Sequence, residues 1–437
     1  MLRYYVWLAL RSLRRNPMLT GLMIAAIGLG IGASMTTLTI FRAMSGDPIP
    51  RKSSLLFVPQ IDNFGPNHRH KDGEPPDMLS YTDAQALMQA HAAPRQAAMY
   101  PTGFVLTPAD PQLRPFKVTG RATYADFFAM FEVPFKYGGS WGTNEDQSRS
   151  DVIVIDSKLN DKLFGGANSV GNSINLDNHD YRVVGVLATW QPQPRVYDVM
   201  NETFGEVEGV FLPFSRAIDR QQPIWGNNEC AADLLPQAGW DGHLRSECVW
   251  VQFWAELPDV AAVQRYRAFL DNYAAEQQRN GRFHWAALTK LRNARQWLEF
   301  AHVVSDESRI LVVVSFSFLF VCLVNAVGLM LAKFMSRAAE TGVRRALGAN
   351  RRAVFTQCLV ETGVIGLAGG LLGLALTAAG LAGVRAVLSQ TAVRLTQLDL
   401  TDVVIAVTLA VLSAVLAGLY PTWRATLVQP AWQLKAN

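Results

Sequence analysis

The sequence lacks the short motifs that most often identify an enzyme. No Gly-x-x-x-x-Gly-Lys-Ser/Thr segment occurs, so the sequence contains no Walker A loop and is not expected to hydrolyse ATP by itself. It has no Gly-x-Ser-x-Gly elbow of a serine hydrolase. His68 and His70 flank Arg69 in a loop rich in Gly, Pro and Asn, and no carboxylate stands at the spacing of a zinc protease. We therefore predict no catalytic residue and no metal site.

Cysteine is also scarce, and its four positions divide between two kinds of surroundings. Cys322 and Cys358 lie in apolar stretches, where cysteine usually behaves as a small hydrophobic residue. Cys230 and Cys248 lie in the polar middle of the chain with 17 residues between them. An oxidising exterior would allow these two to form a disulfide, and two unpaired thiols are the alternative.

Four long apolar stretches determine the class of protein. They cover residues 19–44, about 310–332, 354–388 and 403–420. A helix needs about 20 apolar residues to span a bilayer, and a soluble protein rarely contains four such stretches. We predict an α-helical membrane protein with four transmembrane helices in a 1+3 arrangement and a large α+β extracytoplasmic domain between the first and second.

The predicted boundaries follow the same pattern. They are a cytoplasmic amphipathic helix at 1–16, a first transmembrane helix at 17–45, an extracytoplasmic domain at 46–302, a stalk and second transmembrane helix at 303–335, a cytoplasmic loop at 336–352, a third transmembrane helix at 353–388, an external loop at 389–400, a fourth transmembrane helix at 401–421 and a cytoplasmic tail at 422–437. A cleaved signal peptide is the alternative at the N-terminus, but the first apolar stretch is too long for one and no Ala-x-Ala site follows it.

The distribution of charge predicts the orientation. Residues 46–308 contain 32 acidic and 24 basic side chains, whereas the rest of the chain contains 4 acidic and 16 basic ones. Short segments rich in Lys and Arg stay on the cytoplasmic side, so both termini and the loop at 336–352 are expected inside. Because the basic residues flank apolar stretches rather than forming one patch, the net charge of +4 does not indicate nucleic-acid binding.

The middle of the chain has the composition of a folded α+β domain, which can divide into two lobes near Gln112–Gly120. The strands predicted from alternating and β-branched residues are Phe57–Ile61, Gln112–Gly120, Asp151–Asp156, Tyr181–Leu187 and Val249–Phe253. The predicted helices are Thr82–His91, Tyr124–Phe131, Ser157–Phe164 and Val260–Gln278. No Pro or strong turn signal occurs between Ala286 and Lys333, which favours a continuous helix that begins outside the membrane as a stalk.

The loop between the second and third apolar stretches carries the most specific motif. From Ser336 to Arg352 it reads Ser-Arg-Ala-Ala-Glu-Thr-Gly-Val-Arg-Arg-Ala-Leu-Gly-Ala-Asn-Arg-Arg. The pattern is compatible with a helix in which Glu340 stands four residues before Arg344, the favourable order for an ion pair. Gly348 is typical of a helix C-terminus, and Asn350 can cap the next helix.

This loop resembles the one between the second and third transmembrane helices in permease subunits of MacB/LolC/FtsX-type ABC transporters, which commonly reads Arg-x-x-Glu-x-Gly-x-Arg-Arg-Ala-x-Gly-Ala. The matching positions are Arg337, Glu340, Gly342, Arg344, Arg345, Ala346, Gly348 and Ala349. An ordinary positive loop would explain the arginines, but not Glu340, Gly342 and Gly348.

Further matches extend the resemblance over nearly the whole chain. Gln357 and Glu361 occupy polar positions that the family often has early in the third transmembrane helix, and Tyr420–Ala425, with Pro430 and Leu434, resembles the family's ending. Segments in the order of MacB-like periplasmic core domains are Val118–Arg121, Asp126–Phe128, Leu163–Gly165, Gly171–Ile174 and Tyr181–Leu187. Gly138–Trp141 departs from the Gly-Arg pair that is usual there.

The resemblance implies that the loop is a coupling helix that docks on a separate ATPase subunit. The residues expected to contact that partner are Arg337, Glu340, Gly342, Arg344, Arg345 and Gly348, whereas Arg351 and Arg352 need no role beyond topology. ATP and Mg²⁺ would bind to the dimeric partner ATPase, and no cofactor to this chain. An acid such as Glu361 within a membrane helix usually faces protein, so we expect a structural partner, with proton transport as the alternative.

Glycines indicate where the membrane helices pack closely. Gly28 and Gly32 form one Gly-x-x-x-Gly pair, and Gly366, Gly369, Gly370 and Gly373 form two more. Such pairs can serve contacts within one subunit or across a dimer.

The function implied by the resemblance is that of a permease subunit in the bacterial cytoplasmic (inner) membrane that works by mechanotransmission and exports peptides, amphiphilic drugs or similar compounds. Its expected partners are the ATPase, a second identical or related permease subunit, a periplasmic adaptor with an outer-membrane channel, and the lipid bilayer. The alternatives are LolC-like lipoprotein extraction, FtsX-like activation of an external hydrolase, and an ATPase-free membrane sensor.

Overall fold

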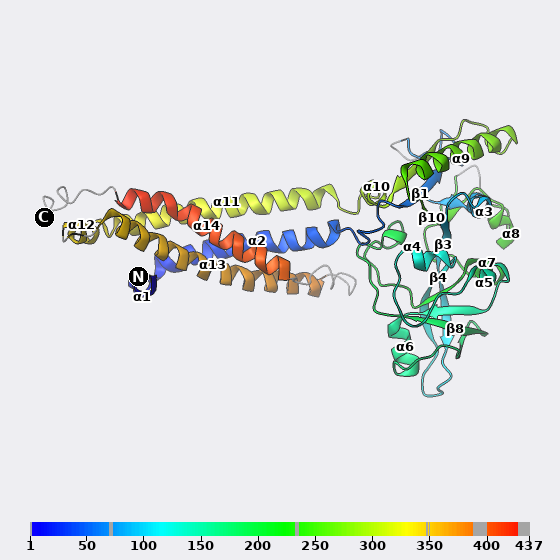
Figure 1. Ribbon diagram of the computed structural model, residues 1–437, viewed down its shortest axis with the longest axis horizontal. Coiled ribbons are helices and arrows are strands. Elements are labelled where there is room, and N and C mark those ends of the chain that lie inside the picture. Colours follow the sequence, from blue (N-terminus) through cyan, green and yellow to red (C-terminus); the bar gives the residue numbers. More distant parts are fainter. Residues whose placement is uncertain are drawn as a thin grey trace. The chain divides into compact units, whose positions relative to one another are not determined.

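The computed structural model describes residues 2–69, 73–231, 236–346, 348, 350–387 and 400–426. They form two compact units, whose elements are drawn in Figure 1. The helical unit combines the residues up to Ser45 with those from Val304 onward, and the sheet unit consists of Gly46–Val303.

Long helices make up the helical unit. They are α1 (Leu2–Arg15), α2 (Pro17–Ser45), α11 (Asp306–Met335), α12 (Ala338–Ala346), α13 (Arg351–Val387) and α14 (Leu400–Thr426). Four of them, α2, α11, α13 and α14, are long and apolar enough to cross a membrane, and they lie side by side in Figure 1. The predicted external loop at 389–400 and the tail beyond Thr426 fall almost entirely outside the described residues.

The spacing of apolar side chains explains how these helices pack. Met23, Ile27, Ile31 and Met35 follow one another at intervals of four on α2, so they share one face, and all four are fully buried. That face packs with buried residues of the other three long helices, among them Leu319, Met330, Ile365 and Ala406. The remaining faces are largely exposed and apolar, as expected for helices surrounded by lipid.

Capping residues determine where the helices begin. Pro17 is the first residue of α2, a position where its missing N–H needs no partner. The Ser305 hydroxyl accepts a hydrogen bond from the Ser308 backbone N–H and caps α11. The continuous stalk helix predicted from Ala286 is therefore wrong. Thr289–Asn293 forms strand β11, Asn293 caps the short helix α10 (Ala294–Phe300), and His302 has a positive φ of 48° before α11 begins.

The sheet unit is built around one mixed sheet with the strand order β11-β1-β10-β3-β4-β9-β6-β8-β5. Its strands are β1 (Leu56–Ile61), β2 (Leu79–Ser80), β3 (Arg95–Thr107), β4 (Phe116–Thr123), β5 (Phe135–Gly138), β6 (Val152–Ile155), β7 (Ser173–Leu176), β8 (His179–Leu187), β9 (Val210–Pro213), β10 (Val249–Glu256) and β11. The pairs β4–β9 and β6–β8 are parallel, and the other strand pairs among the described residues are antiparallel.

Short helices connect these strands. They are α3 (Tyr81–Ala90), α4 (Asp126–Met130), α5 (Thr143–Gln147), α6 (Ser157–Phe164), a 3₁₀ turn (Val196–Asp198), α7 (Phe214–Asp219), α8 (Trp240–Leu244), α9 (Val260–Arg279) and α10. The predicted helices correspond to α3, α4, α6 and α9 within one or two residues at each end. The predicted strand at Gln112–Gly120 begins only at Phe116 and pairs along β3, so the proposed boundary between lobes falls on a strand inside the sheet.

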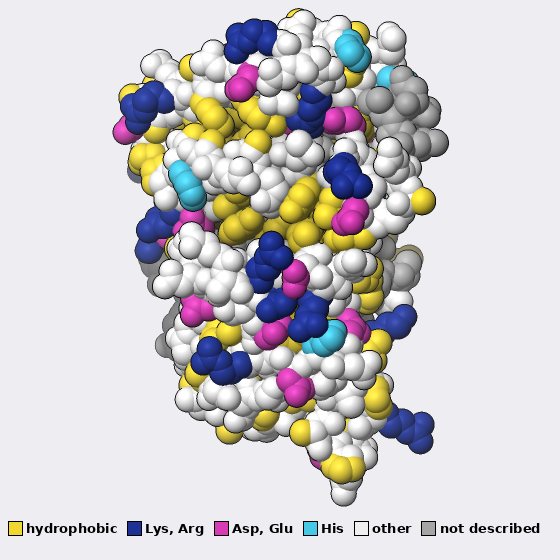
Figure 2. All heavy atoms as spheres, turned by 90° about the vertical axis from the view of Figure 1, so that its right-hand side faces the viewer, with side chains coloured by type: hydrophobic (Ala, Val, Ile, Leu, Met, Phe, Trp, Pro, Cys, Tyr) yellow, Lys and Arg dark blue, Asp and Glu magenta, His cyan; other side chains and the backbone are white. Residues whose placement is uncertain are grey.

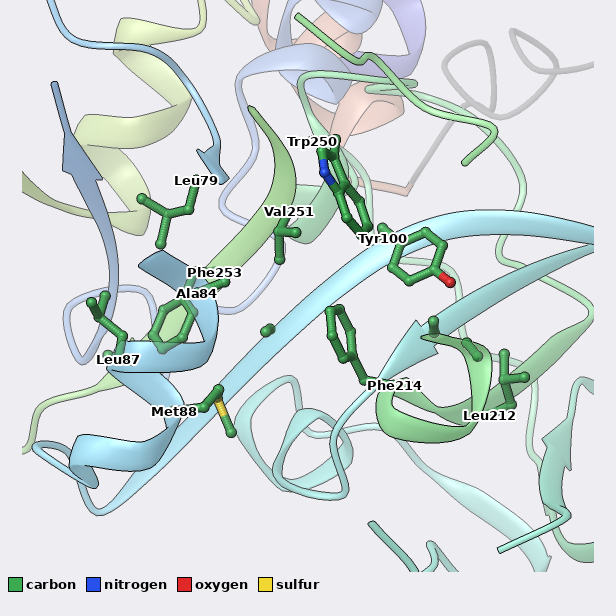
Figure 3. Packing of buried hydrophobic residues seen from close by; sticks show 14 of the residues in the cluster. Leu79, Ala84, Leu87, Met88, Tyr100, Leu212, Phe214, Trp250, Val251 and Phe253 are labelled. Carbon is green, nitrogen blue, oxygen red and sulfur yellow. The ribbon is translucent and has the colours of Figure 1, made fainter. Parts of the chain in front are cut away.

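Aromatic side chains fill much of the core beside β3 and β10. Tyr100 of β3 meets Trp250 of β10 with ring centroids 5.0 Å apart and Phe214 at 5.5 Å, in both cases nearly perpendicular. Figure 3 shows these three rings converging from a strand, a neighbouring strand and a short helix. Such edge-to-face pairs stabilise by about 1 kcal/mol beyond the burial of their area. On the face drawn in Figure 2, by contrast, basic and acidic side chains are interspersed.

Candidate functional site

The motif found in the sequence begins in the turn before α12, continues through α12 and ends at the start of α13. Gly348 has a φ of 101°, the left-handed conformation that favours glycine after a helix end. The Asn350 side-chain oxygen accepts a hydrogen bond from the Arg352 N–H, and its carbonyl accepts from Ala353 and Val354. Asn350 therefore starts α13 as a cap, and the loop between the two helices is short.

Glu340 joins the motif to the N-terminal helix. Its carboxylate lies 2.9 Å from Nη1 of Arg15, at the end of α1. Both side chains are partly exposed, so this ion pair contributes at most about 1 kcal/mol. The predicted pairing with Arg344 involves a side chain outside the described set, as does the role of Arg345, although the backbone of both lies in α12.

Arg337 makes a second link to the same helix. One guanidinium nitrogen donates to the Ser12 hydroxyl and the other donates to the Ser12 carbonyl at 3.1 Å. The Ser12 hydroxyl in turn donates to the Glu361 carboxylate. Arg337 itself lies 3.7 Å from that carboxylate. The residue just before α12 is therefore tied to both α1 and α13.

Glu361 is the centre of this network. It is 3% exposed, and its Oε1 lies 2.7 Å from Nζ of Lys333, which is 1% exposed. Lys333 also donates to the Thr20 hydroxyl of α2 at 3.3 Å. Removing one member of a buried pair leaves a charge without compensation and typically costs about 3 to 5 kcal/mol. The partners of Glu361 are those of a structural ion pair, and they connect α1, α2, α11 and α13.

We call Ser12, Lys333, Arg337 and Glu361 the four-residue cluster. Gln357, the second predicted polar residue of α13, lies with Glu361 on the wall of a cavity beside this cluster. Gly342 of α12 is buried within the chain, whereas its neighbour Val343 is 54% exposed. Whether the motif residues contact a partner stays a prediction.

The predicted glycine pairs lie at contacts between helices of the same chain. A Cβ atom on Gly28 would come within 2.8 Å of Leu372, and one on Gly366 within 1.9 Å of the Ala414 side chain. A Cβ atom would meet a neighbouring helix at 2.6 to 2.8 Å at the remaining predicted positions, which are Gly32, Gly369, Gly370 and Gly373. These glycines bring α13 close to α2 and to α14.

The structure also joins the two cysteines of the sheet unit. Cys230 and Cys248 form a disulfide. Cys248 is fully buried just before β10, and the adjacent residues Glu229 and Val249 form an isolated β-bridge. The disulfide therefore fastens the segment at Glu229 to the start of β10.

Sequence reasoning missed several members of these networks. From the sequence, no role is assigned to Lys333 or to Ser12. The available hint was that two basic residues, Lys333 and Arg337, follow the second apolar stretch closely, while Glu361 is a lone acid in an apolar stretch. A further missed pair is Arg42 with Asp402, 2.7 Å apart, between the end of α2 and the start of α14.

Two models of known protein families match this chain. The model of the MacB-like periplasmic core domain matches residues 20–273, and that of the FtsX-like permease C-terminal region matches residues 312–430. The chain belongs to the MacB-like family of ABC transporter permeases. The MacB-like match covers β1 to β10 together with α2, and the FtsX-like match contains α12 and the four-residue cluster except for Ser12.

Curated relatives of this MacB-like permease are distant. The pyoverdine export ATP-binding/permease protein PvdT of Pseudomonas aeruginosa is 25% identical over 71% of this chain and 41% of its own length. The macrolide export ATP-binding/permease protein MacB of Bdellovibrio bacteriovorus is 23% identical over 68% and 41%. An ABC transporter permease of Bacillus subtilis, YvrN, is 23% identical over 71% and 68%. The chain thus spans about two fifths of the length of the first two.

Proposed function

We propose that this chain is the permease subunit of an ATP-driven exporter whose ATPase is a separate chain and which works by mechanotransmission. The observation that carries the proposal is the network around the family motif, because it gives the motif helix a physical connection to the membrane helices. A movement of α12 would be transmitted through Arg337 and Glu340 to α1, and through Lys333 and Glu361 to α11 and α13.

The proposed topology follows from the charge distribution. The chain lies in the bacterial inner membrane with α1, α12 and both termini on the cytoplasmic side and the sheet unit outside. In that orientation α12 faces the compartment that contains ATP. The partner ATPase would bind ATP and Mg²⁺, since this sequence has no Walker A loop.

The cargo is proposed to be a peptide, an amphiphilic drug or a similar compound. Support comes from the names of the relatives, which describe export of macrolides and of pyoverdine. A second permease subunit, identical or related, would complete the membrane part. A periplasmic adaptor with an outer-membrane channel would carry the cargo onward.

The first experiment captures the chain from gently solubilised native membranes and identifies what accompanies it by mass spectrometry. We expect a P-loop ATPase, with or without a sister permease. Recovery of a lipoprotein carrier or an external hydrolase instead would favour the LolC-like or FtsX-like alternative. Recovery of this chain alone at every detergent strength would contradict the proposal and favour the ATPase-free sensor.

A charge exchange tests whether Glu340 contacts the ATPase or only Arg15. Glu340→Arg breaks the ion pair, and the double change Arg15→Glu with Glu340→Arg restores it in reverse. If Glu340 docks on the ATPase, both variants lose most of the captured ATPase. Recovery of normal capture in the double variant would instead show that the pair has only an internal role.

A second variant probes the exposed side of the same helix. Val343→Arg places a charge at an exposed position of α12 and should weaken capture of the ATPase by about tenfold or more, since a desolvated charge at an interface without a partner is costly. Val343 is a better test position than Gly342. A large residue such as tryptophan at the buried Gly342 would disturb the packing of this chain itself. Arg14→Glu on α1 is the control, and capture of the ATPase should be unchanged.

A further inference from the structure

A cavity of about 530 Å³ lies among α1, α11, α12 and α13 in the helical unit. Its volume is within the range of small-molecule sites, about 300 to 1,000 Å³. Ser12, Arg337 and Glu361 of the four-residue cluster line this cavity, and α1 also contributes Trp7, Arg11 and Arg15. The contacts within the cluster explain how the cavity wall is held together, but they do not explain why a cavity is present.

The charges on the wall favour an anion. Arg11, Arg15 and Arg337 line the cavity, together with the carboxylates Glu340 and Glu361. Both carboxylates already have cationic neighbours, Arg15 at 2.9 Å and, behind the wall, Lys333 at 2.7 Å. The three arginines on the wall therefore outnumber the two carboxylates, and the cavity carries a net positive charge.

Arg11 is the residue best placed to bind that anion. Its side chain makes no ion pair or hydrogen bond with the residues that the structure describes, and its guanidinium lies 5.6 Å from the centre of the Trp7 ring. Stacking on an aromatic ring holds a guanidinium without using its N–H donors. Those donors suit the two oxygens of a phosphate, to which arginine binds in a bidentate manner.

The cavity also has an apolar rim. Tyr4 and Trp7 lie three residues apart on α1, line the cavity, and are 60% and 55% exposed. Tyrosine and tryptophan are enriched where membrane proteins meet the headgroup region, because the ring is apolar and its polar atom remains hydrated. A ligand at this site would therefore be anionic at one end and apolar at the other.

We propose that the cavity binds the phosphate headgroup of an anionic phospholipid from the cytoplasmic leaflet, with Arg11 as the principal contact and the acyl chains beside Tyr4 and Trp7. Basic pockets between membrane helices on this side are known to hold acidic headgroups. The inference rests on the proposed topology, which places α1 at the cytoplasmic face, but it does not require an ATPase. The lipid would fill the space between α1 and the motif helix.

Native mass spectrometry of the purified full-length chain in detergent tests the proposal. Phosphatidylglycerol and phosphatidylcholine are titrated separately, and soluble glycerol phosphate is added as a competitor. We expect phosphatidylglycerol to bind about tenfold more tightly than phosphatidylcholine, and Arg11→Gln to remove most of that preference. Arg11→Lys, which keeps the charge but not the planar fork, should retain part of it.

Arg14→Gln is the matched control, since Arg14 is an exposed arginine of the same helix that does not line the cavity. It should change the affinity for phosphatidylglycerol less than about twofold. An equal loss in both variants would overturn the proposal in favour of general surface attraction. Competition by glycerol phosphate at the concentration of the lipid would overturn it in favour of a free phosphate ester.

The lipid-binding experiment can succeed or fail independently of the proposed exporter function. A chain that captures no ATPase but shows the Arg11-dependent lipid preference would contradict the exporter and support the lipid site. A membrane-impermeant thiol reagent applied to intact cells carrying Arg14→Cys checks the topology. Labelling from outside would overturn the cytoplasmic position of α1 and the lipid proposal together.

Discussion

Buried charges are enclosed differently in the two units of this protein. In the sheet unit, Arg121 and Arg195 lie among the carboxylates of Asp198 and Glu208, and all four are at most 3% exposed. Arg121 Nε donates to Glu208 at 2.8 Å, and Arg195 Nη2 donates to the same oxygen at 2.7 Å. In the helical unit, Lys333 of α11 and Arg337 of the turn between α11 and α12 approach Glu361 of α13 beside a cavity.

The two networks differ in how completely other side chains surround the buried charges. The carboxylate of Glu208 also accepts from the Tyr197 hydroxyl at 3.1 Å, and Gln252 of β10 accepts from Arg121 at 2.8 Å. Such a densely hydrogen-bonded network fixes one arrangement of the strands and the loop, although the buried Nε of Arg195 has no hydrogen-bond partner among the described residues. The four-residue cluster instead joins separate helices, and Ser12, Arg337 and Glu361 line a cavity. The first network suits a rigid domain, and the second suits a joint.

The pKa of Glu208 reflects how closely the first network surrounds its carboxylate. Burial alone would raise the pKa of Glu208, but the guanidinium groups of Arg121 and Arg195 hold it below its ordinary value. A carboxyl whose folded pKa is depressed contributes stability above its unfolded pKa, and this contribution disappears as the pH falls through the folded pKa.

The largest expected effect comes from breaking the closed network. Glu208→Ala should lower the free energy of unfolding of the sheet unit by about 3 to 5 kcal/mol, because two buried guanidinium groups lose a shared acceptor. A urea titration of the full-length chain in detergent, read by proteolysis of the sheet unit, measures the change. Glu206→Ala is the control, since its ion pair with Lys158 is exposed and contributes at most about 1 kcal/mol. Equal effects of the two changes would refute the comparison.

A second prediction concerns pH and a buried carboxyl of the same unit. Burial raises the pKa of Asp146 to about 7, despite hydrogen bonds from the Trp141 indole and the Ala125 N–H. An unfolded Asp titrates near 4, so between about pH 4 and pH 7 the folded state holds a proton that the unfolded state has lost. Stability should therefore fall as the pH rises through this range, by roughly 2 to 4 kcal/mol.

Asp146→Asn should flatten that pH dependence, because the amide does not titrate. The same urea titration at several pH values between 4 and 8 provides the measurement. A stability that rises over this range in the natural sequence, and in the variant alike, would show that Asp146 is ionised throughout.

The smallest effect is expected at the joint. Glu361→Gln should lower the thermal stability of the helical unit by about 2 kcal/mol, less than the loss at Glu208, since Arg337 lines the cavity and is only partly buried. Adding Lys333→Met should recover most of the loss by removing the charge left without a partner. The fraction of monodisperse protein after heating in detergent measures both. A loss at Glu361 as large as that at Glu208, without recovery in the double variant, would show that the joint is as rigid as the sheet.

Much of the fold could be predicted because it depends on local signals. Apolar length predicted the four long helices. Strands with strong β-branched patterns, such as β8, were also predicted. The longest strand, β3 (Arg95–Thr107), was missed. Its Ala, Pro and Gly residues have low strand propensity, and only pairing with β4 and β10 makes it a strand.

The candidate site was predicted only in part for a related reason. The motif identified Arg337, Glu340 and Glu361 as positions of interest, but their partners Ser12 and Arg15 lie more than 300 residues away in the sequence. The stalk helix was predicted wrongly because the capping strength of Asn293 and Ser305 was not recognised between apolar segments.

The sequence by itself determined that this chain has four helices able to cross a membrane, an α+β domain between the first two, and a motif typical of ABC permeases. These properties depend on the transfer of apolar residues out of water and on local helix and strand preferences, which are encoded residue by residue. Only the tertiary structure decided which charges meet at Glu361 and Glu208, and that α1 closes one side of a basic cavity. An ion pair between distant residues depends on the packing of whole helices and strands, and no local pattern in the chain specifies that packing.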